Sequence, residues 1–358
     1  MGKLQPAFQK IGKSKLLIPI LSLVILVIFN LIRDPSFFSI NVAVNSYGNK
    51  VLSGNLIAIL NGASELAILA MGMTLVTAAS KGQDISVGAA AAIAGSVFVK
   101  VLLTNNITWG IIALAFLASC LVMVVFGAFN GVLVAVFNIQ PMIATLILFT
   151  IGRAIAYWIN GGATPTVEDE RIKYIGGTIP GIAIPTPILI VIFCGILFAL
   201  ALKFTNLGLY AQTVGINERA ARLNGINSLF IKLLVFIILG VCCAFSGAIT
   251  VGRLGLINHE TILLGIEMDA ILAVAIGGNS LGGGKFNMVG SVIGAYVIQG
   301  LTTTLYAMKV SSTDVKAYKA VVIIAIVVVG SPVVKNAASK FWNKLFGKKK
   351  TSAVPKIS

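Results

Sequence analysis

Four carboxylates, Glu65, Asp84, Glu267 and Asp269, lie inside or at the edges of long apolar runs of the sequence. An ionisable side chain at membrane depth costs about 2.5–3.5 kcal/mol on insertion scales, so it faces other helices or a polar cavity. Glu65 therefore makes a structural hydrogen bond to a neighbouring helix or takes part in transport. Glu267 and Asp269 either start a helix, where the dipole favours carboxylates, or accept hydrogen bonds from the hydroxyl groups of a solute.

A short polar interruption contains Asp84. Residues 81–88 read KGQDISVG and separate two apolar runs. Asp84 and Ser86 occupy positions where an N-cap of the following helix would lie, because both side chains accept hydrogen bonds from free N–H groups. The same pattern is also typical of a discontinuous helix that lines a transport path.

A second interruption follows Glu267 and Asp269. Residues 267–300 run from an apolar segment, through a glycine cluster at 282–284, into an apolar segment of small residues. Irregular backbone at membrane depth is tolerated only where protein or a water-filled cavity satisfies its N–H and C=O groups. The stretch therefore predicts two helices that meet at a break, with Gly290 and Gly294 forming a small-residue face for close helix packing.

Membrane spans must position these residues. Hydrophobic residues make up 58% of the chain, charged residues 11%, and the mean hydropathy is +1.00, a balance that soluble domains do not show. Because a span needs roughly 20 apolar residues, the length predicts an all-α polytopic membrane protein with about ten transmembrane helices and discontinuous segments. The expected spans cover about 16–32, 52–79, a run to 103, 109–137, a run to 158, 182–202, 230–251, two within 267–300, and 317–334.

The net charge of +16 is concentrated at the two ends of the chain. Basic residues precede the first span and lysines follow the last, so the positive-inside rule places both ends in the cytoplasm. We expect basic tails at 1–15 and 335–358 around a transmembrane domain at 16–334. Lysines beside a span indicate contact with anionic membrane lipid rather than with nucleic acid.

Enzyme and metal chemistry are not indicated. Residues 279–286 resemble a phosphate-binding loop only superficially, because Asn279 replaces its first glycine and Phe286 its magnesium-binding hydroxyl residue. The four cysteines lack metal-ligand spacing and are expected to pack inside spans. His259 has no catalytic partner and is expected at the surface, and Arg153 is expected to snorkel rather than to contact a substrate. The sequence predicts no catalytic residue and no metal site.

Residues 217–227, NERAARLNGIN, form a charged segment between two spans on the expected cytoplasmic side. Gly225 can end a short helix there. The segment is either a docking surface for a partner protein or an ordinary amphipathic connection.

Four segments of the chain resemble permease subunits of bacterial ABC importers for monosaccharides, in the branched-chain amino acid and ribose permease family. They read GMTLVTAASKGQDISVGAAAAIAG (72–95), NIQPMIATLILFTIGRAIAYWINGG (138–162), YAQTVGINERAARLNGI (210–226) and EMDAILAVAIGGNSLGGGKFNMVGSVIGAYV (267–297). TTTLY at 302–306 and KAVV at 319–322 are similar to the galactofuranose and ribose branch. KGQDIS at 81–86 departs from the family's usual GGIDLS, which leaves the sugar open.

The resemblance implies a permease domain in the bacterial cytoplasmic membrane that imports a monosaccharide by alternating access. A cytoplasmic ABC ATPase would bind ATP and Mg²⁺, so this chain would bind no cofactor. The other implied partners are an extracytoplasmic sugar-binding protein and a second permease subunit, identical or different. The implied ATPase-coupling residues are Asn217, Glu218, Arg219, Ala220, Ala221, Arg222 and Gly225. The expected path residues are Glu65, Asp84, Ser86, Asp269, Asn279, Ser280, Gln299 and Thr302.

Two alternatives stay open at this point. A permease for nucleosides or branched-chain amino acids would share the same architecture. A secondary transporter coupled to protons or other ions would use Glu65 and Asp84 as a relay.

Overall fold

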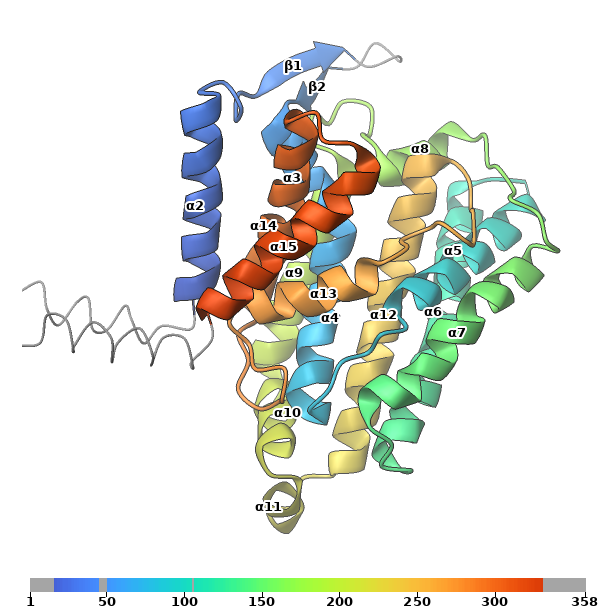
Figure 1. The fold of residues 1–358 in the computed structure, drawn as a ribbon. Coiled ribbons are helices and arrows are strands. Elements are labelled where there is room, and N and C mark those ends of the chain that lie inside the picture. The colour runs from blue at the N-terminus through green and yellow to red at the C-terminus, as the bar shows by residue number, and fades with distance from the viewer. Residues whose placement is uncertain (1–15, 45–49, 105, 331–358) are drawn as a thin grey trace, which may run out of the picture.

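The computed structural model describes residues 16–44, 50–104 and 106–330, which form a helical bundle with one small hairpin (Figure 1). The helices are α2 (Leu17–Arg33), α3 (Asn55–Gly62), α4 (Ser64–Ser80), α5 (Val87–Leu103), α6 (Trp109–Ala135), α7 (Pro141–Ile159), α8 (Glu170–Gly176), α9 (Thr186–Phe204), α10 (Leu207–Ile216), α11 (Glu218–Leu223), α12 (Ser228–Leu254), α13 (Ile266–Ile276), α14 (Met288–Ala307) and α15 (Ser312–Gly330). Strands β1 (Asn41–Val44) and β2 (Lys50–Ser53) pair antiparallel. The basic tails expected at 1–15 and 335–358 lie outside the described residues.

Helices occur at every expected span, although they differ in length. Helices α6, α7, α9, α12 and α14 are long and apolar enough to cross a membrane, and α3 with α4, bent by 41°, makes a sixth candidate. The chain is therefore a multi-pass membrane protein, and the count of ten spans stays a prediction. Helix α13 has 11 residues, roughly 16 Å at 1.5 Å per residue. It covers about half of a hydrocarbon core of roughly 30 Å, so α13 alone is shorter than the span expected there.

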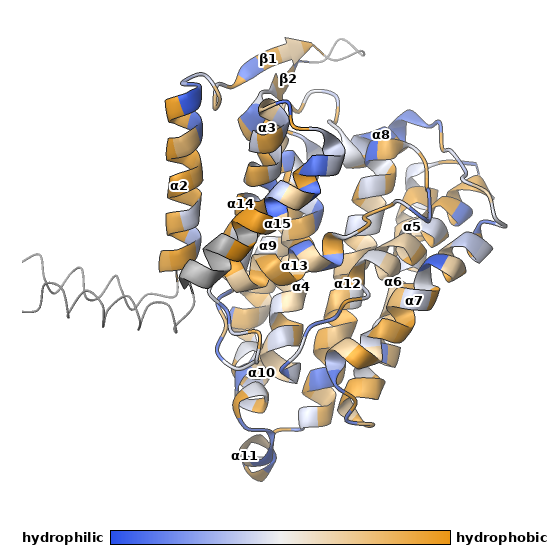
Figure 2. Cartoon of the chain, in the orientation of Figure 1, coloured by the Kyte–Doolittle hydropathy of each residue, from blue (hydrophilic) through white to orange (hydrophobic). Residues whose placement is uncertain are grey.

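The outer helices present apolar side chains to the surroundings (Figure 2). Ile32 on α2 and Leu121 on α6 are 80% and 68% exposed. Inside the bundle, small residues let the helices approach closely. A Cβ at Gly240 on α12 would lie 2.4 Å from the carbonyl oxygen of Met123 on α6, so only glycine allows this approach. This distribution, apolar outside and tightly packed inside, is the one that a lipid solvent favours.

Two connections contain structure that the sequence did not predict. The segment before α3 forms the β1–β2 hairpin, so the expectation of an entirely helical fold is wrong in this detail. The connection between α7 and α9 contains α8, which Asp169 caps by accepting from the backbone N–H of Arg171. The hairpin and α8 lie at one end of the bundle and α11 lies at the other (Figure 1).

Candidate transport and coupling site

Helix α4 forms the centre of the bundle. Every residue from Ser64 to Ser80 is buried, and the helix packs against α9, α10, α12, α13 and α14. It ends at Lys81, whose φ of 59° is left-handed. Polar groups on and beside α4 lie at its two ends and at its middle, and these groups make up the candidate site.

At its first turn α4 is bound to α12 by an ion pair. The guanidinium of Arg253 lies 3.2 Å from Glu65 Oε1 and donates to Oε2 at 3.2 Å. Thr250 donates to the same carboxylate at 3.3 Å. Arg253 also donates to the carbonyl oxygen of Asn61 at 2.9 Å, on the far side of the α3–α4 bend. Of the two roles expected for Glu65, the structure shows the bond to a neighbouring helix.

The first break, residues 81–86, is closed by Asp84. One carboxylate oxygen accepts from the backbone N–H and the hydroxyl of Ser86 at 2.7 and 2.6 Å, and the other accepts from Asn130 at 3.3 Å. Ser86 precedes α5 but its side chain caps none of the helix N–H groups. The expected N-cap is therefore wrong, because Asp84 is used to close the turn that precedes the helix.

The second break, residues 277–287, is held together by Asn279. Its side-chain N–H groups donate to the carbonyl oxygens of Val274 and Asn287 and to the hydroxyl of Ser291. Its oxygen accepts from the backbone N–H of Asn287. The hydroxyls of Ser291 and Thr74 lie 2.7 Å apart, which ties this break to the middle of α4.

Close packing joins α14 to α13 beyond this break. A Cβ at Gly290 would lie 2.2 Å from the carbonyl oxygen of Gly277, and a Cβ at Gly294 would lie 2.2 Å from that of Ala273. The face that the sequence suggested for helix packing thus lies directly against α13.

The two breaks contact each other. Gln83 in the first break donates from its side chain to the carbonyl oxygen of Leu281 in the second, at 2.7 Å. Gly284 donates from its backbone to the carbonyl oxygen of Ala78 on α4, at 2.9 Å. These two hydrogen bonds therefore join the second break both to the first break and to the end of α4.

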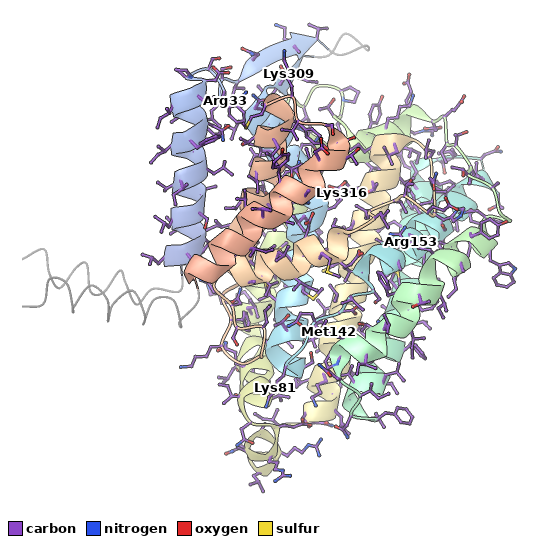
Figure 3. All side chains as sticks on the ribbon, viewed as in Figure 1. Arg33, Lys81, Met142, Arg153, Lys309 and Lys316 are labelled. Carbon is purple, nitrogen blue, oxygen red and sulfur yellow. The ribbon has the colours of Figure 1, made fainter. Side chains whose placement is uncertain are left out.

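The end of α10 packs onto the same place. A Cβ at Gly215 would lie 1.7 Å from the carbonyl oxygen of Ala78 and 2.8 Å from the backbone nitrogen of Gly284. Lys81 donates to the carbonyl oxygen of Ile216, the last residue of α10, at 3.4 Å. We call the contact of 78–86, 215–216 and 281–284 the inner junction. Lys81 lies at this lower end of the bundle in Figure 3.

Helix α11 follows directly after the inner junction. Asn217 caps it by accepting from the backbone of Ala220. Glu218 accepts from Arg222 and from Lys232 of α12, each at 2.6 Å. Burial alone would raise the pKa of Glu218, but the hydrogen bonds and charges of Lys232 and the other donors outweigh it, so the pKa lies below its usual value. This ionised carboxylate fixes α11 to the start of α12, while Leu223 is 90% exposed.

Carboxylates also lie at the first turn of α13. Asp269 accepts from Lys319 of α15 at 2.7 Å, and both side chains are about one-fifth exposed. Glu267 is 4% exposed and packs against the backbone of Gly88 at the start of α5. The residue before α13 is Gly265, and no side chain caps this helix. The pair of Asp269 and Lys319 thus presents a donor and an acceptor side by side on the surface of the bundle.

Comparison with known proteins decides the family. Residues 55–330 match the family described as branched-chain amino acid transport system / permease component. The chain is 39% identical over 281 residues to the galactofuranose transporter permease protein YtfT of Escherichia coli (strain K12), covering 78% of this chain and 80% of the relative. It is 33% identical over 351 residues to the fructose import permease protein FruF of Bifidobacterium longum (strain NCC 2705), covering 97% and 96%. It is 36% identical over 317 residues to the ribose import permease protein RbsC of Escherichia coli (strain K12), covering 87% and 92%.

The chain belongs to this permease family. The resemblance stated from the sequence is therefore confirmed. No solved structure matches the chain.

The structure of the permease explains two side chains differently from the sequence. Arg153 was expected to snorkel, but it donates to the carbonyl oxygens of His259, Glu260 and Ile262 at 2.8–3.1 Å and so holds the segment that leads into α13. His259 is only 13% exposed, and its ring packs edge-on against Tyr157. The histidine is therefore more covered than expected, because the Arg153 contacts fold this segment onto α7.

Two other residues expected along a path are hydrogen-bonded within the permease, and a third is packed against a neighbouring helix. Ser280 accepts from the backbone of Gly282, Thr302 donates to its own helix, and Gln299 packs against Gly62 at the α3–α4 bend. Two site residues were not predicted from the sequence, namely Asn130 and the α12 arginine that pairs with Glu65. Their signal was present, since each is a polar residue within or at the end of an apolar run.

Proposed function

We propose that this permease is the membrane-spanning subunit of a bacterial ABC importer that carries a monosaccharide across the cytoplasmic membrane, while a separate ABC ATPase hydrolyses ATP. Relatives named for galactofuranose, fructose and ribose support the solute class. The single structural observation that supports the mechanism is the inner junction, because it joins α11 to both broken segments.

In this proposal α11 docks on the ATPase through its exposed surface, including Leu223 and the residues around Arg219. Movement of α11 passes through α10 to Gly215 and Ile216, and from there to the breaks at 81–86 and 277–287. A rigid contact transmits displacement because packed helices shift between discrete arrangements rather than deform continuously. Each state of the ATPase then favours one arrangement of the two breaks. Coupling requires such contacts, which differ between the two states of the transporter.

The solute path in this proposal runs past the surface of α13 and α15. Asp269 and Lys319 offer an acceptor and donors at the first turn of α13, and sugar hydroxyls both donate and accept hydrogen bonds. A second permease subunit facing this surface would enclose the path, and an extracytoplasmic sugar-binding protein would deliver the solute at the end that carries β1, β2 and α8. We further propose ten spans with both termini in the cytoplasm.

A branched-chain amino acid is the second candidate solute, because the description of the matching family names it. An amino acid also requires a site for its carboxylate, such as an exposed helix N-terminus. An ion-coupled secondary transporter is less well supported. Glu65 is paired with Arg253 and Asp84 is bonded to Ser86 and Asn130, so neither acid presents a free carboxylate to the other.

The test is affinity purification of the tagged full-length chain from its native membranes in mild detergent, with mass spectrometry of the co-purifying proteins. We expect an ABC ATPase in near-stoichiometric amount, and uptake that requires ATP and survives collapse of the proton gradient. A chain that purifies alone, with uptake abolished by collapse of the gradient at constant ATP, would refute the importer and favour the secondary transporter. Competition of labelled ribose uptake by sugars and by leucine then separates the two solute classes.

A further inference from the structure

Helix α2 is attached to the bundle at few points. It packs against α14, where Asn30 donates to the hydroxyl of Thr304 at 2.8 Å and Arg33 donates to the carbonyl oxygen of Ala307 at 2.9 Å. Most of its remaining surface is exposed. In Figure 1 it stands beside the bundle rather than within it.

A groove of about 400 Å³ lies between α2, α14 and α15. Its walls are almost entirely apolar, with Ile25, Leu26 and Phe29 on α2 facing Leu301 and Leu305 on α14. We call it the α2–α14 groove. Because both helices belong to the membrane domain, the groove opens toward the hydrocarbon of the bilayer, and its apolar lining fits an acyl chain.

The mouth of the groove is basic. Phe29 and Met308 line its end. Arg33 follows Phe29 by one helical turn, and Lys309 follows Met308 directly. Both cations are exposed, and Figure 3 places them at the same end of the molecule. The nearby carboxylates are engaged locally, since Asp34 accepts from Ser36 and Asp314 accepts from Ser311.

We propose that the α2–α14 groove binds one acyl chain of an anionic phospholipid whose phosphate contacts Arg33 and Lys309. The lipid fills the space between α2 and the bundle and holds α2 in place. A phosphate complements the guanidinium, which presents several donors in a plane. A second copy of the chain fits less well, because a two-fold contact centred on this mouth would bring the same cations together.

The experiment is native mass spectrometry of the full-length permease released from nanodiscs that contain equal amounts of phosphatidylglycerol and phosphatidylcholine. We expect one retained phospholipid, enriched in phosphatidylglycerol. A basic residue near an anionic membrane surface contributes about fivefold to lipid affinity, so Arg33→Gln and Lys309→Gln should each lower the enrichment about fivefold. Arg33→Lys should keep most of it. Lys50→Gln, which removes a cation from β2, is the matched control and should change nothing.

The groove itself is tested by Ile25→Trp, which places an indole where the acyl chain lies and should abolish retention of either lipid. Leu21→Trp is its control, because Leu21 is 50% exposed on α2 and does not line the groove. Equal enrichment in the wild type and in the Arg33→Gln/Lys309→Gln double variant would overturn the headgroup assignment. Efficient disulfide crosslinking of Ile25→Cys between two copies would overturn the lipid and identify a second permease as the occupant.

Discussion

Replacement of Gly215 by alanine should uncouple α11 from the broken segments. The new Cβ would lie 1.7 Å from the carbonyl oxygen of Ala78, whereas Cβ contacts in proteins essentially never fall below 3.0 Å. Helix α10 and the end of α4 must therefore separate by at least 1.3 Å at this point, which disrupts the inner junction. Such overpacking costs about 1–3 kcal/mol, offset by about 0.5–1 kcal/mol because alanine favours the helix.

The assay is ATP-driven uptake and binding-protein-stimulated ATPase activity of the complex in proteoliposomes. Because 1.4 kcal/mol is about a tenfold change in an equilibrium constant, we expect coupled uptake to fall about tenfold while basal ATPase activity persists. Gly195→Ala on α9 is the matched control, since no atom lies within 4 Å of its added Cβ, and its uptake should equal that of the wild type.

Wild-type uptake and ATPase stimulation in a well-expressed Gly215→Ala variant would refute the coupling route through the inner junction. A loss of folded protein would not count as support, so the amount of assembled complex is measured by size-exclusion chromatography in both variants. Crosslinking across α10 and α4 provides a second measurement, because the separation of these two helices should lower its yield.

Four further outcomes are expected. Gly225→Leu should lower ATPase stimulation with normal expression, because a side chain at its φ of +77° costs about 1–2 kcal/mol and shifts the end of α11. Asp269→Asn should impair uptake or assembly by leaving Lys319 without its charged partner, an effect of about 1–3 kcal/mol on a partly buried ammonium. Asp84→Ala should lower the Tm of the complex more than Asp84→Asn, which keeps an acceptor for the turn. The protection of α11 amides from hydrogen exchange, relative to their intrinsic exchange rates, should be highest near neutral pH and should fall only in acid, because a lowered pKa at Glu218 makes its contribution complete above about 4.5 and progressively lost as the pH falls through the lowered pKa.

Each of these outcomes has a control or a contradictory result. Gly181→Leu has the same strained backbone in open space at the other end of the molecule, so an equal loss of ATPase stimulation would remove the argument for α11. Recovery of uptake by Asp269→Asn combined with Lys319→Gln would identify the lone charge as the cause, and unchanged uptake in Asp269→Asn would show that the pair is dispensable. Equal Tm values for the two Asp84 variants would mean that its hydrogen bonds do not hold the turn. Rapid exchange of α11 at neutral pH would contradict the Glu218 contacts.

The positions of the helices were largely predictable from the sequence. Apolar runs placed the long helices of the membrane domain, because a span must be continuously apolar to enter lipid. The breaks at 81–86 and 277–287 were predictable for the same reason, since glycine and polar residues interrupt such runs. The β1–β2 hairpin and α8 were missed, because short elements at a bundle end depend on contacts such as that of Leu52 with Ala183.

The amino-acid sequence alone determined the class of protein and the positions at which its helices break. It also determined which polar residues are costly to place in a bilayer. The tertiary structure decided what those residues do. It paired Glu65 with Arg253, used Asp84 to close a turn, and brought Gln83, Leu281 and Gly215 together although they are far apart in the sequence. The periodicity of a sequence shows only which face of a helix is apolar. The residues that a side chain contacts on another helix depend on how the helices pack, and those residues come from distant parts of the chain.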